Sequence, residues 1–237
     1  SIGDIFTEVE KDRSDFGVVP IENSTEGIVN YALDMFMESD LKICSEILLK
    51  ISQNLLSAEK SLKNIKTVYV NSQSLSQARK WLETNLPAVK PVQVTTTSEA
   101  ARLAKLKKKS AAISSLLAAK VYGLNVVAKN IEDSSENFTR FLVIGRSMAQ
   151  KSGNDKTSIL CSMKDKAGAL HRLLRPFDKY HVNMSSIESR PSRQKAWDYL
   201  FFVDFQGHIS EPKVQKTLEL IGKECQYLKV LGSYPAA

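Results

Sequence analysis

The sequence is poor in cysteine and histidine, which narrows the chemistry open to it. Cys44, Cys161 and Cys225 lie far apart and form no C-x-x-C pair. This argues against a disulfide framework or a zinc site, and we expect reduced thiols in a cytoplasmic protein. The three histidines all fall in the last third of the chain without ligand spacing. We therefore expect no metal and no metal-dependent hydrolase.

The sequence also lacks long hydrophobic runs. None approaches the roughly 20 apolar residues that a membrane helix needs. The first fifteen residues are acidic and amphipathic, unlike a signal peptide. We expect no membrane partner. The 237 residues, of which 43% are hydrophobic and 25% charged, have an ordinary globular composition, sufficient for one large or two smaller domains.

A polar segment divides the chain. Residues 148–156 read MAQKSGNDK, without hydrophobic periodicity, which predicts a linker. We place a first domain at residues 1–147, a linker at 148–155 and a second domain at 156–237. Counted along the chain, the first 150 residues carry 19 basic and 17 acidic groups, and the remaining 87 carry 14 and 9. Most of the net charge of +7 is thus assigned to the second part.

A lysine-rich run, residues 105–109, raises the possibility of a nucleic-acid partner. A solvated helix end is favoured instead, because cations suit a helix C-terminus. No aromatic residues are interleaved with the lysines, and no nucleic-acid motif accompanies them. We expect no nucleic acid to bind.

Before the linker, short apolar runs alternate with amphipathic helical patterns. This alternation predicts an α/β layer fold with a partly parallel sheet. Ligands of such sheets collect at strand ends and in clefts between lobes. The helices are expected near residues 2–9, 28–37, 75–86, 98–107 and 115–122, and the strands near 16–19, 67–70, 92–95 and 111–113.

After the linker the pattern changes to β-α-β-β-α-β, the ferredoxin-like arrangement, in roughly 80 residues. The sheet of such a domain has open edges, so pairing with a second copy is expected. The strands are expected near residues 157–163, 182–187, 197–205 and 228–231, with helical faces formed by Leu170, Leu173, Leu174 and Phe177 and by Val214, Leu218 and Ile221.

The first polar cluster follows a short strand that we expect to end at Pro20. Glu22, Asn23 and Ser24 then enter a turn before a helix. Free backbone N–H groups at a helix N-terminus form an anion site. The competing interpretation is that Asn23, Ser24 or Thr25 merely caps the helix.

The second and third clusters lie later in the chain. Thr139 and Arg140 stand between aromatic residues at the start of an apolar strand, and an arginine fork suits a carboxylate. An ordinary strand, with Arg140 facing structural carboxylates such as Glu132 or Asp133, is the alternative. The third cluster, residues 188–191 (ESRP), ends a strand with an expected Glu188–Arg190 ion pair, about twenty residues after Gly168 opens a helix.

Taken in order, these motifs resemble the prephenate dehydratase family. The resemblance rests on GVVPIENSTEG from Gly17, N-F-T-R-F from Asn137, and Gly-Ala-Leu at 168–170 with ESRP at 188–191. It implies a two-lobed, periplasmic-binding-protein-like α/β dehydratase domain followed by a ferredoxin-like βαββαβ ACT domain. Nothing matches the Gly-Pro-x-Gly-Thr-Phe-Ser motif with which the family usually opens, so we expect the first lobe to be incomplete, with the chain truncated at its N-terminus.

The resemblance implies that prephenate loses water and carbon dioxide to give phenylpyruvate, without a cofactor. The family's catalytic threonine maps onto Thr139, a positioned donor to the leaving hydroxyl, and Arg140 is expected to hold a carboxylate. The residues expected to bind substrate are Glu22, Asn23, Ser24, Gln77 and Phe141.

The resemblance also implies that the ACT domain binds L-phenylalanine as an inhibitor, between subunits of a homodimer or homotetramer. Arogenate dehydratase and a non-enzymatic phenylalanine-binding fragment are the alternatives. The residues expected to bind the effector are Gly168, Ala169, Leu170, Asn183, Glu188, Ser189 and Arg190.

Overall fold

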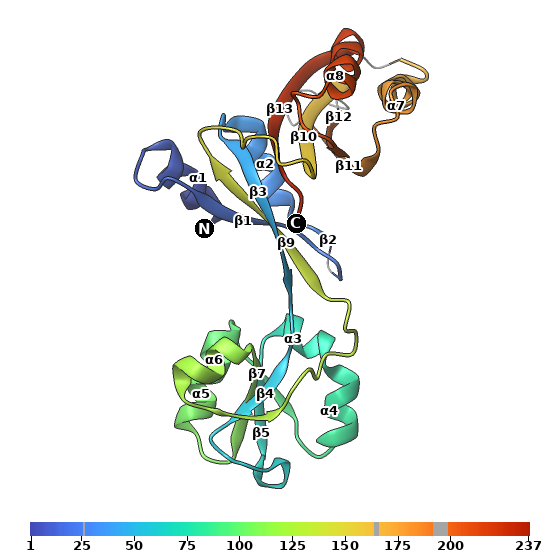
Figure 1. Cartoon of the computed structure of the whole chain (residues 1–237). Coiled ribbons are helices and arrows are strands. Elements are labelled where there is room, and N and C mark those ends of the chain that lie inside the picture. The colour runs from blue at the N-terminus through green and yellow to red at the C-terminus, as the bar shows by residue number, and fades with distance from the viewer. Residues whose placement is uncertain (26, 164–165, 192–198) are drawn as a thin grey trace. The chain divides into compact units, whose positions relative to one another are not determined.

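The computed structural model describes residues 1–25, 27–163, 166–191 and 199–237. They form two compact units (Figure 1). The larger unit combines Ser1–Leu49 with Thr139–Ala237, and the inserted unit is Lys50–Phe138. In the described part of the chain, no helix is long and apolar enough to cross a membrane.

The larger unit begins with a small α/β layer, which we call the N-terminal lobe. Its sheet has the order β2-β1-β9-β3 and is covered by two helices. The predicted first helix is confirmed: Ser1 and Asp4 form a capping box, and Phe6 and Val9 are buried. The elements are α1 (Ile2–Glu10), β1 (Gly17–Asn23), β2 (Gly27–Ile28), α2 (Asn30–Glu38), β3 (Lys42–Lys50) and β9 (Phe138–Gly145).

Strand β1 differs from the prediction in a way that moves the first polar cluster. It runs through Pro20 to Asn23, with a register shift after Pro20. Proline is tolerated at such irregularities, where a strand hydrogen bond is missing anyway. Helix α2 starts only at Asn30, and its N-cap Val29 makes no side-chain hydrogen bond. Both interpretations of this cluster as a helix N-terminus, anion site or cap, are therefore wrong.

Residues 155–235 form the second part of the larger unit, which we call the C-terminal domain. Its four strands are antiparallel in the order β11-β12-β10-β13, which confirms the βαββαβ arrangement. Trp197, where we expected the third strand to begin, lies outside the described residues. The elements are β10 (Asp155–Met163), α7 (Ala169–Lys179), β11 (Met184–Pro191), β12 (Tyr199–Gln206), α8 (Pro212–Glu224) and β13 (Cys225–Pro235).

The two faces of the C-terminal sheet bury different partners. On one face, Ile159 and Phe205 pack with Leu173 and Phe177 of α7. Side chains on the other face join the core of the N-terminal lobe, among them Leu160, Phe202, Leu231 and Tyr234. The backbones approach closely there: a Cβ added to Gly232 would lie 2.2 Å from the carbonyl oxygen of Ile43. The N-terminal lobe and the C-terminal domain therefore share one core.

The inserted unit has a five-stranded mixed sheet of the order β6-β5-β7-β4-β8. Strand β5 is parallel to β6 and β7, whereas β4 is antiparallel to its neighbours, which confirms the partly parallel sheet. The helix expected over 75–86 is instead two helices that meet at Ala78. The elements are β4 (Asn54–Ser57), η1 (Leu62–Asn64), β5 (Thr67–Val70), α3 (Ser72–Gln77), α4 (Arg79–Asn85), β6 (Pro91–Gln93), α5 (Thr97–Leu106), β7 (Ser110–Ser114), α6 (Leu116–Tyr122) and β8 (Asn125–Ala128).

Candidate active site

The first two polar clusters lie on neighbouring antiparallel strands. Asn23, the last residue of β1, stands opposite Thr139 near the start of β9. The Asn23 side-chain amide donates to the Thr139 hydroxyl oxygen over 2.9 Å. We expected these two motifs to form opposing walls of one substrate pocket. The structure instead places them side by side on one sheet, in direct hydrogen-bond contact. Ser24 follows Asn23 as an exposed residue of the β1–β2 connection.

The orientation of the Asn23 amide is fixed by its neighbours. Its Oδ1 accepts from the Thr25 backbone N–H at 3.0 Å and lies 2.6 Å from the Thr25 hydroxyl. A backbone N–H can only donate, so the amide nitrogen must face Thr139. The Thr139 oxygen therefore accepts from Asn23, which leaves the Thr139 proton to be donated elsewhere. Such a hydroxyl is arranged to act as a hydrogen-bond donor.

Arg140 points away from Thr139, because successive side chains of a strand alternate between its faces. Its Nη1 lies 2.7 Å from Asp204 Oδ2, and its Nε donates to Glu46 Oε2 over 2.8 Å. Its Nη2 donates to the Tyr234 hydroxyl over 3.1 Å. We expected structural carboxylates such as Glu132 or Asp133 as the alternative partners. The carboxylates that bind Arg140 are instead Glu46 and Asp204.

This charged cluster is mostly buried. The side chains of Arg140, Asp204 and Glu46 are 13%, 15% and 0% exposed. Burial opposes the charge of Arg140, but Asp204, Tyr234 and Glu46 raise its pKa above the ordinary value. Burial would also raise the pKa of Glu46. Hydrogen bonds from Lys156 and the Ala237 N–H, with the charges of Arg140 and Lys156, hold that pKa below its usual range.

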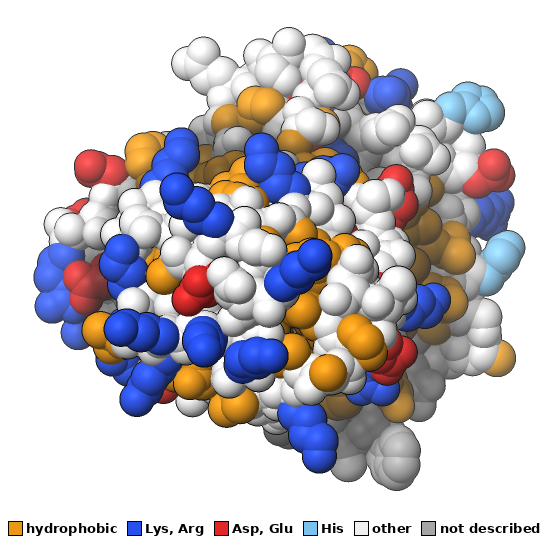
Figure 2. Space-filling model, turned by 90° about the horizontal axis from the view of Figure 1, so that it is seen from below, with side chains coloured by type: hydrophobic (Ala, Val, Ile, Leu, Met, Phe, Trp, Pro, Cys, Tyr) orange, Lys and Arg blue, Asp and Glu red, His pale blue; other side chains and the backbone are white. Residues whose placement is uncertain are grey.

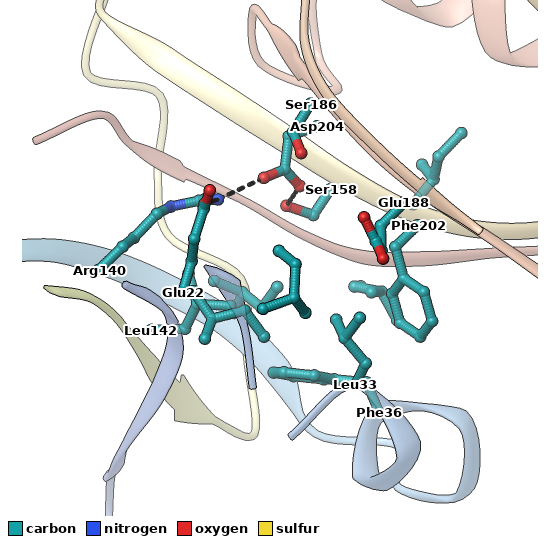
Figure 3. Close-up of a pocket in the computed structure, with 15 residues that line it drawn as sticks. Glu22, Leu33, Phe36, Arg140, Leu142, Ser158, Ser186, Glu188, Phe202 and Asp204 are labelled. Carbon is teal, nitrogen blue, oxygen red and sulfur yellow. Dashed lines mark hydrogen bonds and ion pairs between the residues drawn. The ribbon is translucent and has the colours of Figure 1, made fainter. Parts of the chain in front are cut away.

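A cavity of about 30 Å³ lies beside this cluster (Figure 3). Figure 3 shows Arg140 and Glu22 on one side, with Ser186, Ser158 and Asp204 across from them. Glu22 is 42% exposed, and its Oε2 is 4.0 Å from Arg140 Nη1. The volume suffices for water but not for a metabolite. The Arg140 side chain thus lies on the β9 face toward the C-terminal domain, while Thr139 lies on the other face.

The remaining substrate-binding candidates fall in two places. Phe141 is two residues from Thr139 on β9 and therefore lies on the same sheet face. Gln77 ends α3 in the inserted unit, where its Oε1 accepts from Gln53 Nε2 over 2.9 Å. Within that unit, Glu132 accepts from the Gln53 backbone N–H over 2.8 Å. Gln77 therefore belongs to a polar cluster of its own.

The effector candidates are spread over α7 and two sides of β11. Gly168 has a φ of 77°, a backbone conformation that favours glycine, and directly precedes α7. Leu170 and Asn183 are exposed. Ser189 stands opposite Phe201, on the face that carries α7.

Glu188 and Arg190 lie on the opposite face of β11, toward the N-terminal lobe. Arg190 Nη2 donates to Asp34 Oδ1 of α2 over 2.6 Å, and both side chains are at least 86% buried. We expected Arg190 to pair with Glu188, but its carboxylate partner is Asp34. Glu188 instead lines the cavity beside Asp204 (Figure 3).

Sequence reasoning missed Glu46, Asp204, Lys156 and Tyr234, which surround Arg140. Glu46 was missed because β3 was not predicted at all: its residues lack a clean alternation of polar and apolar side chains. The available signal was an acidic residue directly followed by three apolar ones, in K-I-C-S-E-I-L-L. Buried charges are nearly always paired, so such a residue predicts a cationic partner.

The family model described as "Prephenate dehydratase" matches residues 1–149, and that of the ACT domain matches residues 157–219. The chain belongs to the prephenate dehydratase family. The prephenate dehydratase of Methanocaldococcus jannaschii is 36% identical to it, over 99% of this chain and 86% of the relative.

A solved relative extends the likeness to the fold. The prephenate dehydratase of Arthrobacter aurescens, in complex with L-Phe, is 32% identical and superposes with a TM-score of 0.86, covering 97% of this chain and 77% of that one. The bifunctional chorismate mutase/prephenate dehydratase of Aquifex aeolicus is 51% identical over the whole of this chain. This chain spans 66% of that relative's length.

Proposed function

We propose that this prephenate dehydratase family member catalyses the decarboxylative dehydration of prephenate to phenylpyruvate. The observation that carries the proposal is the hydrogen bond from Asn23 to Thr139, which joins two motifs of the family on adjacent strands. That contact fixes one hydroxyl as an acceptor from Asn23 and leaves its proton for a substrate.

Beyond such a hydrogen-bond donor, the reaction needs little from the protein. The electrons of the carbon–carbon bond to the departing carboxylate move into the ring, which becomes aromatic, and the ring hydroxyl departs. That hydroxyl takes up a proton and leaves as water, while the carboxylate leaves as carbon dioxide. Aromatisation provides the thermodynamic drive, so the protein's task is to orient the substrate and assist the departing oxygen.

Thr139 is the proposed donor to that oxygen. A threonine hydroxyl is a weak acid, so it acts as a positioned donor whose proton is restored by water or a neighbour. Accepting from Asn23 strengthens this role, because hydrogen bonds in a chain polarise one another. In the same proposal, Glu22, Asn23, Ser24, Gln77 and Phe141 orient the substrate, and Arg140 acts through its strand rather than by touching the substrate.

We further propose that L-phenylalanine binds the C-terminal domain of a homo-oligomeric, cytoplasmic protein and inhibits it. The Arthrobacter relative was solved in complex with L-Phe, which supports this effector. Gly168, Ala169, Leu170, Asn183 and Ser189 are the proposed direct contacts. Because Glu188 and Arg190 face the N-terminal lobe, we propose that they respond to the effector indirectly.

The test of Thr139 compares two substitutions for phenylpyruvate formation. Thr139→Ala removes the donor and is expected to lower kcat by about 10²–10⁴-fold. Thr139→Ser keeps a hydroxyl and should retain most of the turnover. Thr84→Ala, on the exposed side of α4, is the matched control and should leave kcat unchanged.

Wild-type turnover by Thr139→Ala would remove Thr139 from the mechanism. Absence of phenylpyruvate formation by the unaltered protein would overturn the proposed function as a whole.

A further inference from the structure

The contacts of Arg140 form a closed ring with three strands of the C-terminal sheet. Arg140 donates to the Tyr234 hydroxyl on β13, which lies 2.7 Å from the Ser158 hydroxyl on β10. Ser158 donates to Asp204 Oδ1 on β12 over 2.5 Å, and Asp204 Oδ2 returns to Arg140. The C-terminal sheet thereby forms a socket for one side chain of the N-terminal lobe.

Each hydroxyl hydrogen in this ring has one acceptor within the ring. The Asp204 carboxylate can only accept, so it takes the single Ser158 proton. Tyr234 accepts from Arg140 and must donate its own proton to Ser158. All the hydrogen bonds of the ring therefore donate in one direction, from Arg140 to Tyr234, on to Ser158 and then to Asp204. Such a ring fixes the position of the guanidinium, because moving it breaks several buried contacts together.

The ring lies between the two functional regions. On its N-terminal side, Arg140 is the neighbour of Thr139 on β9, so the socket constrains the backbone that carries the proposed donor. On its C-terminal side, Asp204 stands opposite Ser186 of β11, the strand that leads to Glu188, Ser189 and Arg190. A shift of β11 against β12 would therefore reach Asp204 before Ser158 or Tyr234, the other members of the socket.

We propose that the Asp204–Arg140 ion pair is the positioning contact through which the C-terminal domain controls Thr139. This inference rests on the proposed function. An effector changes turnover only by favouring one of two arrangements, and the socket supplies a discrete contact that can differ between them. Allosteric couplings are typically about 5–150-fold, which is the range that this contact would have to carry.

The test is Asp204→Asn, which keeps the shape and the acceptor for Ser158 but removes the charge. We expect the dissociation constant for phenylalanine, measured by calorimetry, to stay within about twofold. The inhibition of prephenate turnover at saturating phenylalanine should fall at least fivefold. Glu219→Gln, in an exposed ion pair of the same domain, is the matched control and should keep full inhibition.

A purely structural role predicts a different result. It would lower the melting temperature of Asp204→Asn but leave the inhibition at saturating phenylalanine intact, and that outcome overturns the proposal. Should Asp204→Asn fail to fold, Tyr234→Phe is the second variant. It removes one hydroxyl from the hydrogen-bond ring and keeps the buried aromatic side chain. It should show an intermediate loss of inhibition, and full inhibition in this variant would also overturn the proposal.

Failure of the proposed function can be distinguished from failure of this inference. If the unaltered protein makes phenylpyruvate but ignores phenylalanine, the proposed catalysis stands, whereas the proposed effector and this inference both fall. If it makes none, the proposed function falls, and amide exchange of β9 decides the inference. Phenylalanine should then alter exchange over Phe138–Gly145 in the unaltered protein but not in Asp204→Asn; identical responses would overturn it.

Discussion

The two units of this protein carry their charge differently. The inserted unit has 14 Lys and Arg against 6 Asp and Glu, a net charge of +8, whereas the rest of the chain has 19 against 20. Six lysines are exposed on two loops of the inserted unit that touch through the Lys66 N–H and the Lys109 carbonyl, at 2.7 Å. The face seen in Figure 2 carries many Lys and Arg side chains and few acidic ones. These loop lysines are Lys60, Lys63, Lys66, Lys107, Lys108 and Lys109.

In the larger unit the important charges are buried and paired, around Arg140 and between Arg190 and Asp34. Exposed charges act at a distance and are screened by salt, whereas buried pairs act at contact and depend on geometry. We therefore propose that the exposed cations of the inserted unit attract anions over a distance, whereas the buried pairs of the larger unit hold its shape.

The largest effect should come from breaking the buried cluster. Glu46→Gln removes the charge from a fully buried side chain that binds both Arg140 and Lys156. Removing one partner of a buried ion pair leaves the other uncompensated, so the free energy of unfolding should fall by about 3 kcal/mol. Urea unfolding measures this, with Glu83→Gln on exposed α4 as control, expected within about 0.5 kcal/mol of the unaltered protein. A loss below about 1 kcal/mol would mean that the cluster does not depend on this charge.

The same residue, Glu46, should make the stability of the larger unit fall at low pH. The folded-state pKa of Glu46 lies below its ordinary value of 4.5, so its contribution to stability is present above pH 4.5 and lost as the pH falls through the folded-state pKa. Melting temperatures between pH 6 and about pH 3 should fall more steeply for the unaltered protein than for Glu46→Gln. Parallel curves for the two proteins would contradict the assignment.

The second buried pair should matter less. Asp34→Asn keeps a hydrogen-bond acceptor for Arg190 but removes the charge, and should cost about 1–3 kcal/mol of unfolding free energy. Asp15→Asn, at an exposed position before β1, is the control and should cost little. Equal stabilities of the two variants would show that Arg190 does not hold β11 against α2.

The smallest effect should come from the lysine loops. Reversing one exposed charge, Lys108→Glu, should lower kcat/KM for a dicarboxylate by about twofold at low salt, because it weakens long-range attraction. The difference in kcat/KM from the unaltered protein should vanish near 0.5 M salt, where the Debye length is only about 4 Å. Lys216→Glu on α8 carries the same change in the C-terminal domain and should have less effect. An equal loss in both variants would remove the inserted unit's special role.

The sequence predicted the elements whose pattern is local. The apolar face of α8, most of that of α7 and the βαββαβ order follow from periodicity. The structure confirms them, except that Leu170 of α7 is exposed. Strand β3 was missed because it lacks a clean alternation of polar and apolar residues and its partner strand β9 lies far away in the sequence. The charge asymmetry was missed for the same reason: counting along the chain put the excess in the last 87 residues, since nothing local marks where the inserted unit begins.

The site was predictable in its parts but not in its pairing. The motifs around Asn23 and Thr139 stood out in the sequence, yet 116 residues separate them, and only the register of β1 against β9 makes them partners. Arg140 follows Thr139 directly, which suggested a shared role. Strand alternation separates them instead, and this could have been foreseen had the first residues of β9 been read as strand rather than as its entry.

Gly232 has a consequence for how this protein can change. There the backbone of β13 lies so close to that of β3 that no side chain fits between them. Even alanine would wedge the two sheets apart and would loosen the Arg140 socket a few residues away, at Tyr234. Exchanging the C-terminal domain for that of another protein would therefore require exchanging the part of β3 around Ile43 as well, because the two backbones fit only each other.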